Sequence, residues 1–140
     1  MADESTALVV QRHLRWGWIT LLVFLTLGLG LESLHGFKVQ AYLASDMRRE
    51  MWRLAHAHGT LLGILCLVSA LLAEAHIAEA IRPRVLAWVR WGAVLMPLGF
   101  FLGGVLNSEG DPSLGIVLVP VGAVLLVVAL VRVAVAPRAR

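Results

Sequence analysis

The chain has 140 residues, of which 59% are hydrophobic, and a formal net charge of +3. A soluble domain of this size does not carry such an apolar bias along its whole length, and the mean hydropathy of +0.83 indicates an integral membrane protein. Most arginines gather at the ends of apolar runs, which is typical of membrane topology and argues against nucleic acid as a partner. We therefore expect a single transmembrane domain over residues 1–140, surrounded by the lipid bilayer.

Four apolar runs have about the 20 residues, or more, that a helix needs to cross the hydrocarbon. The first begins with Trp16 and Trp18, which suit a membrane interface, and it lacks the features of a signal peptide, so we expect it to remain as an uncleaved span. The predicted fold class is all-α, an integral membrane four-helix protein. Its spans are predicted at about residues 16–34, 52–76, 85–106 and 114–135.

The segment between the first two spans, residues 36–53, is polar but keeps a helical repeat. Apolar residues recur there every three or four positions, and charged residues take the other faces. This pattern predicts an interfacial amphipathic helix that runs into the second span. Turns are predicted around Pro83 and over residues 107–112, where proline, glycine and polar residues cluster.

Two histidines, His56 and His58, lie in the opening turns of the second span. Successive helix residues turn by about 100°, so the two imidazoles point about 200° apart and cannot both bind one ion. They must face different neighbours, which favours two separate sites or sites completed by other helices or subunits. Imidazoles at membrane depth are costly and mark candidate functional sites. Gly59 and Gly63 follow, and they allow either a neighbouring helix or a flat ligand to approach closely.

Further metal donors lie at the same predicted side of the membrane. Glu32 and His35, one turn apart, share a face at the end of the first span, which is how helical bundles offer a carboxylate and an imidazole to one metal. A polar helix end that meets water is the alternative. Glu109 and Asp111 fall in the last turn, on the same side. Copper or zinc would suit a metal site formed by imidazoles and carboxylates from this set: Glu32, His35, His56 and His58.

The basic residues orient the chain in the membrane. With four spans, both termini and the second connection share one side, which carries more of the arginines. We expect both termini to be cytoplasmic, in a multi-pass protein of the cell (inner) membrane. The residues on that side are Arg12, Arg15, Arg82, Arg84, Arg90, Arg132, Arg138 and Arg140, against Lys38, Arg48, Arg49 and Arg53 on the other.

The run Leu54-Ala55-His56-Ala57-His58-Gly59-Thr60-Leu61-Leu62 resembles the haem-bearing helices of subunit I in the haem–copper oxidase and nitric oxide reductase superfamily. One of those helices has a His-Gly pair near the outer face, and another has a His-x-His whose imidazoles ligate different haems. That subunit has twelve spans in sets of four, with histidines on the second span of each set. The likeness covers mainly residues 51–63, the span count and the orientation. A homotrimer of this chain would resemble that architecture.

The resemblance implies that His58 ligates a low-spin haem, a haem b, and that His56 faces a second site. The chain departs from the superfamily because it has no adjacent histidine pair for copper and no His-x-x-x-Tyr. Its single tyrosine, Tyr42, lies in the interfacial segment. Oxidase or reductase chemistry is therefore not expected, and whether the protein is an enzyme stays open. Haem binding with electron transfer is what the likeness supports.

Three functions follow from these observations. The first is a small membrane haem protein for electron transfer, homo-oligomeric with a trimer favoured, whose partner is a respiratory-chain protein. The second is a membrane protein that binds copper or zinc at its outer face. The third is a structural or accessory subunit of a larger membrane complex, in which the histidines bond to backbone carbonyls and the glycines pack helices. The residues that would hold the haem are His58, His56, His35, Gly59 and Gly63.

Overall fold

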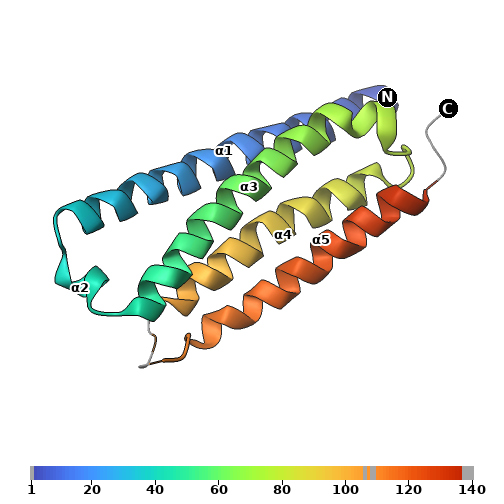
Figure 1. The fold of residues 1–140 in the computed structure, drawn as a ribbon. Helices are drawn as coiled ribbons and strands as arrows, with labels where there is room; N and C mark the ends of the chain where they lie inside the picture. Colours follow the sequence, from blue (N-terminus) through green and yellow to red (C-terminus); the bar gives the residue numbers. More distant parts are fainter. Residues whose placement is uncertain (1, 106, 108–109, 137–140) are drawn as a thin grey trace.

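The computed structural model describes residues 2–105, 107 and 110–136, with side chains from residue 7 onward. Its described part contains helices and no strand (Figure 1). Four helical stretches are long and apolar enough to cross a membrane, which confirms the predicted all-α, four-span class. The elements are α1 (Ala2–Gly36), α2 (Gln40–Leu43), α3 (Asp46–His76), α4 (Arg82–Gly103), the 3₁₀ helix η1 (Leu114–Val117) and α5 (Leu118–Val135).

The long helices alternate in direction and pack in chain order. α1 packs on α3, α3 on α4, and α4 on α5, with a smaller contact between α1 and α4 (Figure 1). The start of α1 and the end of α5 therefore lie at one end of the molecule, which we call the terminal end. The short helix α2 lies at the opposite end, which we call the α2 end. The even number of spans accounts for this arrangement.

The core lies between α3, α4 and α5 and is built mostly from small and branched side chains. Glycines bring α4 and α5 together. A Cβ atom added to Gly122 would lie 2.7 Å from the backbone nitrogen of Met96, and one added to Gly99 would lie 2.8 Å from that of Val119. Glycine at position 99 is therefore needed for this close packing of α4 on α5. The buried core residues are Leu62, Cys66, Ala73, Ile77, Val85, Leu86, Val89, Ala93, Leu126 and Ala129.

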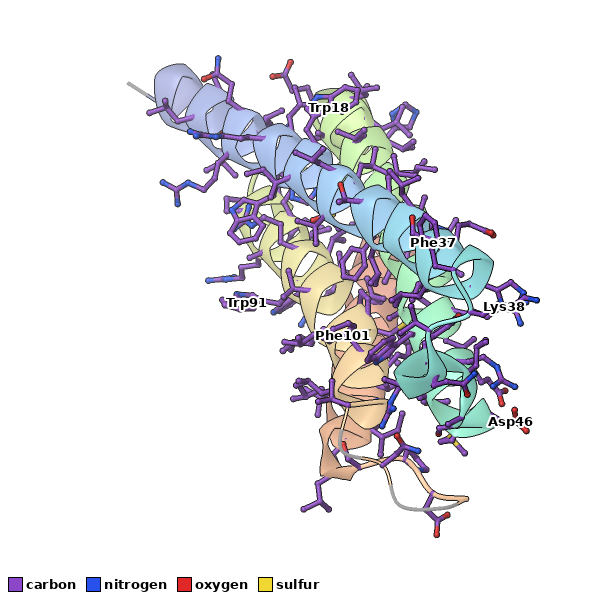
Figure 2. The ribbon with its side chains drawn as sticks, turned by 90° about the vertical axis from the view of Figure 1, so that its left-hand side faces the viewer. Trp18, Phe37, Lys38, Asp46, Trp91 and Phe101 are labelled. Atoms are coloured by element: carbon purple, nitrogen blue, oxygen red, sulfur yellow. The ribbon has the colours of Figure 1, made fainter. Side chains whose placement is uncertain are left out.

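Large apolar side chains cover the outside of the molecule. Leu22 of α1, Leu71 of α3 and Val124 of α5 are each at least 60% exposed, and many others are more than one-third exposed. Figure 2 shows side chains such as Trp18 and Trp91 projecting away from their helices. Such a surface suits lipid and not water, in agreement with a multi-pass membrane protein.

The helix boundaries differ from the predicted spans at two places. α1 begins at Ala2 and has 35 residues, so at 1.5 Å per residue it is about 52 Å long and extends beyond the hydrocarbon. The expected amphipathic helix over residues 36–53 is not one element. Ser45 is extended and caps a new helix by accepting a hydrogen bond from the Arg48 backbone N–H at 3.2 Å, so the charged repeat forms the first turns of α3. Only α2, with four residues, is separate.

The third span ends earlier than predicted. α4 ends at Gly103, and residue 106, the predicted end, lies outside the described residues, as does Glu109. The fourth predicted span, 114–135, matches η1 and α5 together.

Candidate functional site

His56 and His58 lie on opposite flanks of the buried face of α3. The Nδ1 atom of His56 lies 2.7 Å from the carbonyl oxygen of Phe24 on α1. The Nδ1 atom of His58 lies 2.9 Å from the carbonyl of Leu54, one turn earlier, and its ring packs against Phe100 of α4 with ring centroids 4.8 Å apart. The prediction that the two imidazoles face different neighbours is confirmed.

These hydrogen bonds define which nitrogen of each imidazole is free. A carbonyl oxygen only accepts, so each Nδ1 carries a proton and donates it, and in the neutral imidazole the lone pair is then on Nε2. Within the described residues, neither Nε2 takes part in a hydrogen bond. An imidazole held through Nδ1–H by a backbone carbonyl, with Nε2 free, is the usual arrangement of a metal-ligating histidine.

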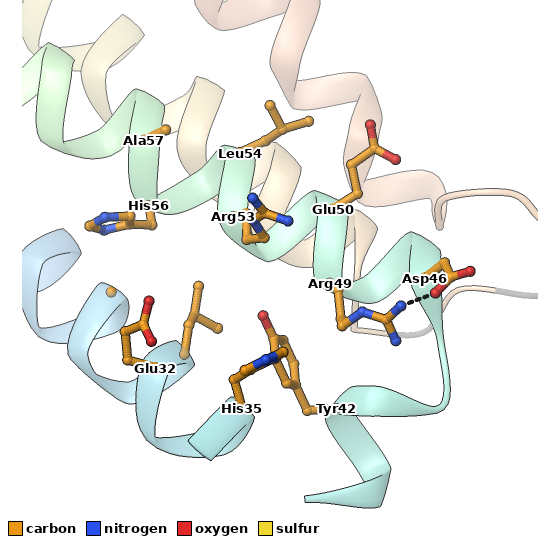
Figure 3. Close-up of a pocket in the computed structure, with 12 residues that line it drawn as sticks. Glu32, His35, Tyr42, Asp46, Arg49, Glu50, Arg53, Leu54, His56 and Ala57 are labelled. Carbon is orange, nitrogen blue, oxygen red and sulfur yellow. Dashed lines mark hydrogen bonds and ion pairs between the residues drawn. The ribbon is translucent and has the colours of Figure 1, made fainter. Parts of the chain in front are cut away.

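A groove of about 1020 Å³ opens beside His56 at the α2 end, between α1, α2 and the first half of α3 (Figure 3). This volume is at the upper limit of the range of small-molecule sites, about 300–1000 Å³. Glu32 of α1 and His56 of α3 both line it. Its polar residues are Glu32, His35, Tyr42, Asp46, Arg49, Glu50, Arg53 and His56, and its small or apolar residues are Gly28, Leu31, Leu54 and Ala57.

Gly28 of α1 makes room for the His56 ring. A Cβ atom added to Gly28 would lie 2.3 Å from Cε1 of His56, far inside van der Waals contact. The absence of a side chain at this position therefore lets the imidazole lie against the α1 backbone and reach the Phe24 carbonyl. Nothing in the sequence singles out Gly28 beyond its being a glycine in an apolar run.

Gly59 and Gly63, predicted to admit either a close helix or a flat ligand, lie against side chains of α1. A Cβ atom at Gly59 would lie 2.1 Å from the Phe24 ring, and one at Gly63 would lie 3.0 Å from Leu21. The space beside both glycines is occupied by these side chains. The structure thus agrees with the close-helix alternative, and neither glycine is among the residues that line the groove.

An aromatic stack attaches α2 to the rest of the molecule next to the groove. The ring of Tyr42, which is 4% exposed, stacks on Trp52 with centroids 6.0 Å apart, and Trp52 stacks on Phe101 at 5.4 Å. The Trp52 indole N–H also donates to the Phe101 carbonyl at 3.1 Å. Arg48 lies over the Trp52 ring and donates to the carbonyl of Gly104. In Figure 3 the Tyr42 hydroxyl points toward the middle of the groove, a position that the sequence did not indicate.

The predicted metal donors come together only in part. Glu32, His35 and His56 line the same groove, whereas His58 faces α4. In the part of the chain that the structure describes, no three side chains of His, Cys, Asp or Glu are placed to hold one metal ion. Of the last-turn acids, Asp111 is exposed outside the groove and Glu109 falls outside the described residues.

Comparison of the chain with protein-family models, with curated proteins and with solved structures finds no match.

Proposed function

We propose that this protein is a small haem-binding membrane protein that transfers electrons, and that His56 holds the haem iron in the groove. The observation that carries the proposal is the hydrogen bonding and position of the His56 imidazole. Its Nδ1–H donates to the Phe24 carbonyl at 2.7 Å, its Nε2 lone pair is free, and it lies at the wall of a groove of cofactor size.

The groove residues suit the chemistry of a haem. A haem is flat and apolar, with two carboxylates on one edge, and axial ligation takes an imidazole from the protein. Leu31, Leu54 and Ala57 supply apolar wall. Arg53 is exposed at the polar mouth and would pair with a propionate, while Arg49 is already ion-paired with Asp46. A zinc ion would need three or four protein donors at one point, which suits this groove less well.

When bound, the haem would supply one-electron exchange. The residues of the chain would orient it and set its surroundings. The Phe24 carbonyl fixes the orientation of the His56 ring and makes Nε2 more basic, which strengthens a bond to iron. The apolar wall would keep water from one side of the site, and burial of this kind tunes a reduction potential.

His58 is the second imidazole of the proposal. As the resemblance to the haem–copper oxidase superfamily implies, it would ligate a low-spin haem at a separate site on the α4 flank of α3, completed by another copy of the chain. Both termini would be cytoplasmic in the cell (inner) membrane, with the α2 end and its groove at the outer face. A respiratory-chain protein would exchange electrons with the haem.

The proposal also includes a homo-oligomer of the chain. We expect three copies of the chain per particle, because a trimer would reproduce the twelve-span arrangement of the superfamily. Light scattering combined with size-exclusion chromatography in a mild detergent, corrected for bound detergent, measures this number. A particle that contains one chain at all accessible concentrations would contradict the trimer, and it would leave the groove of the single chain as the place for haem.

The haem and metal content of the purified protein tests the function. Protein produced in haem-replete cells should contain at least one haem per chain in a pyridine haemochrome assay, and iron should match haem in elemental analysis. Copper or zinc in stoichiometric amount without haem would contradict the proposal in favour of the outer-face metal site. Absence of haem and metal would contradict it in favour of a structural subunit, whose histidines would use the same carbonyl hydrogen bonds for packing.

A further inference from the structure

Tyr42 of α2 places a phenol hydroxyl at the groove, and ligation of iron by His56 leaves this hydroxyl unused. Tyr42 is 4% exposed, and it is one of the residues that line the groove. In Figure 3 its hydroxyl points toward the middle of the groove. The hydroxyl has no hydrogen-bond partner among the described residues. Its proton is therefore available to a ligand.

Contacts with α3 and α4 fix the direction of this hydroxyl. The Tyr42 ring stacks on Trp52 with centroids 6.0 Å apart, and Trp52 is held in turn by its stack on Phe101 and its hydrogen bond to the Phe101 carbonyl. Two arginines of α3 also donate to backbone carbonyls on either side of Tyr42, Arg48 to Ala41 and Arg49 to Leu43. The hydroxyl is thus positioned before a ligand binds, which lowers the cost of using it.

The groove is apolar at the level of His56 and polar toward the α2 end. Gly28 of α1 lies against the His56 ring, and α1 and α3 run in opposite directions. Later residues of α1 and earlier residues of α3 therefore lie nearer the α2 end. A haem ligated by His56 would direct its two carboxylates that way, because a carboxylate needs polar partners. All charged residues of the groove lie on that side, namely Glu32, Asp46, Arg49, Glu50 and Arg53.

The charges at this end do not suffice to hold two carboxylates. Arg49 is ion-paired with Asp46, so in the part of the chain that the structure describes only Arg53 is an arginine of the groove without an ion pair. Glu32 and Glu50 line the groove beside it. A second propionate would therefore meet more negative than positive charge, and a neutral donor suits it. Tyr42 has the only hydroxyl among the groove residues, and it donates without adding charge.

We propose that the Tyr42 hydroxyl donates a hydrogen bond to one propionate of the haem, while Arg53 pairs with the other. This inference rests on the haem site proposed for the groove. It adds the residue that sets which edge of the flat ligand faces α2. A porphyrin without carboxylates would lose both contacts, so Tyr42 contributes to the selection of haem as the ligand.

Tyr42→Phe tests this contact, because it removes the hydroxyl and keeps the ring that stacks on Trp52. All proteins compared carry His58→Ala, so that only the groove is measured. In a titration of the apoprotein in detergent, Tyr42→Phe should bind haem about tenfold more weakly, as expected for loss of a hydrogen bond to a charged group. Iron etioporphyrin, which has no carboxylate, should bind equally well with and without the hydroxyl.

Ser33→Ala is the matched control, since it removes an exposed hydroxyl of α1 that bonds to the Leu29 carbonyl and does not line the groove. It should bind haem like its parent. His56→Ala should lose both porphyrins, which separates ligation of iron from contact with a carboxylate. Circular dichroism checks that each variant is folded.

Equal haem affinity of Tyr42→Phe and its parent would overturn the proposal and would leave ligation by His56 intact. An equal loss of affinity for haem and for iron etioporphyrin would also overturn it, because the hydroxyl would then act through the structure of the groove and not on a carboxylate. If the parent protein binds neither porphyrin, the proposed haem site itself is wrong, and the role of Tyr42 is rejected with it.

Discussion

His56→Ala should yield a folded protein that has lost the haem of the groove. The substitution removes an imidazole that lines the groove, and occupancy of the groove by haem should fall at least tenfold because a coordinate bond is lost. The half-buried position of His56 keeps the loss of packing small. The measurement is the molar ratio of haem to chain after purification, with helix content checked by circular dichroism.

His35→Ala is the matched control for this variant. His35 lines the same groove but is exposed at the end of α1, and it should keep the wild-type ratio if His56 is the ligand. His58→Ala should alter the spectrum while the groove stays occupied, because His58 lies on the α4 flank of α3. A His56→Ala protein with wild-type haem content would show that the groove does not hold haem through this residue.

Gly28→Leu should lose the haem of the groove almost as completely as His56→Ala, although every histidine is retained. The added Cβ atom would lie 2.3 Å from Cε1 of His56, so the ring must leave its position and its hydrogen bond to the Phe24 carbonyl. We expect at least a tenfold lower haem affinity and a loss of about 1–3 kcal/mol of stability, as for other over-packed sites. Haem titration of the purified apoprotein and thermal unfolding in detergent measure the two effects.

Gly30→Leu provides the control for the change in α1. A Cβ atom at Gly30 would meet no atom within 4 Å, so this variant should bind haem like the wild-type protein. If Gly28→Leu and Gly30→Leu bind haem equally well, the position of the His56 ring does not determine binding.

The four spans could be predicted from hydropathy because each apolar run must cross the same thickness of hydrocarbon. The ends of the helices could not be predicted from hydropathy as well as the spans. Hydropathy marks where apolar residues stop, whereas a helix continues through polar residues, as α1 does from Ala2 onward. The division of residues 36–53 depends on the capping hydrogen bond of Ser45, which a periodic pattern does not reveal.

The candidate site, too, could be predicted only in part from the sequence. The opposite directions of His56 and His58 follow from helix geometry alone, and the structure agrees. The groove depends on how α1 and α3 are aligned, which brings Gly28 against His56 although the two are far apart in the sequence. Tyr42 enters the groove because its ring stacks on Trp52, a contact that helical periodicity does not predict. Residue spacing along one helix therefore predicted the directions of the side chains, whereas contacts between helices could not be predicted from the sequence.

The reduced-minus-oxidised visible spectrum of the purified wild-type protein tests haem binding most directly. Protein from haem-replete cells should give, on reduction with dithionite, the Soret shift and the sharp α and β bands of a b-type haem, and His56→Ala should lose the groove component of that spectrum. A featureless difference spectrum from protein that is folded and produced in haem-replete cells would contradict the account.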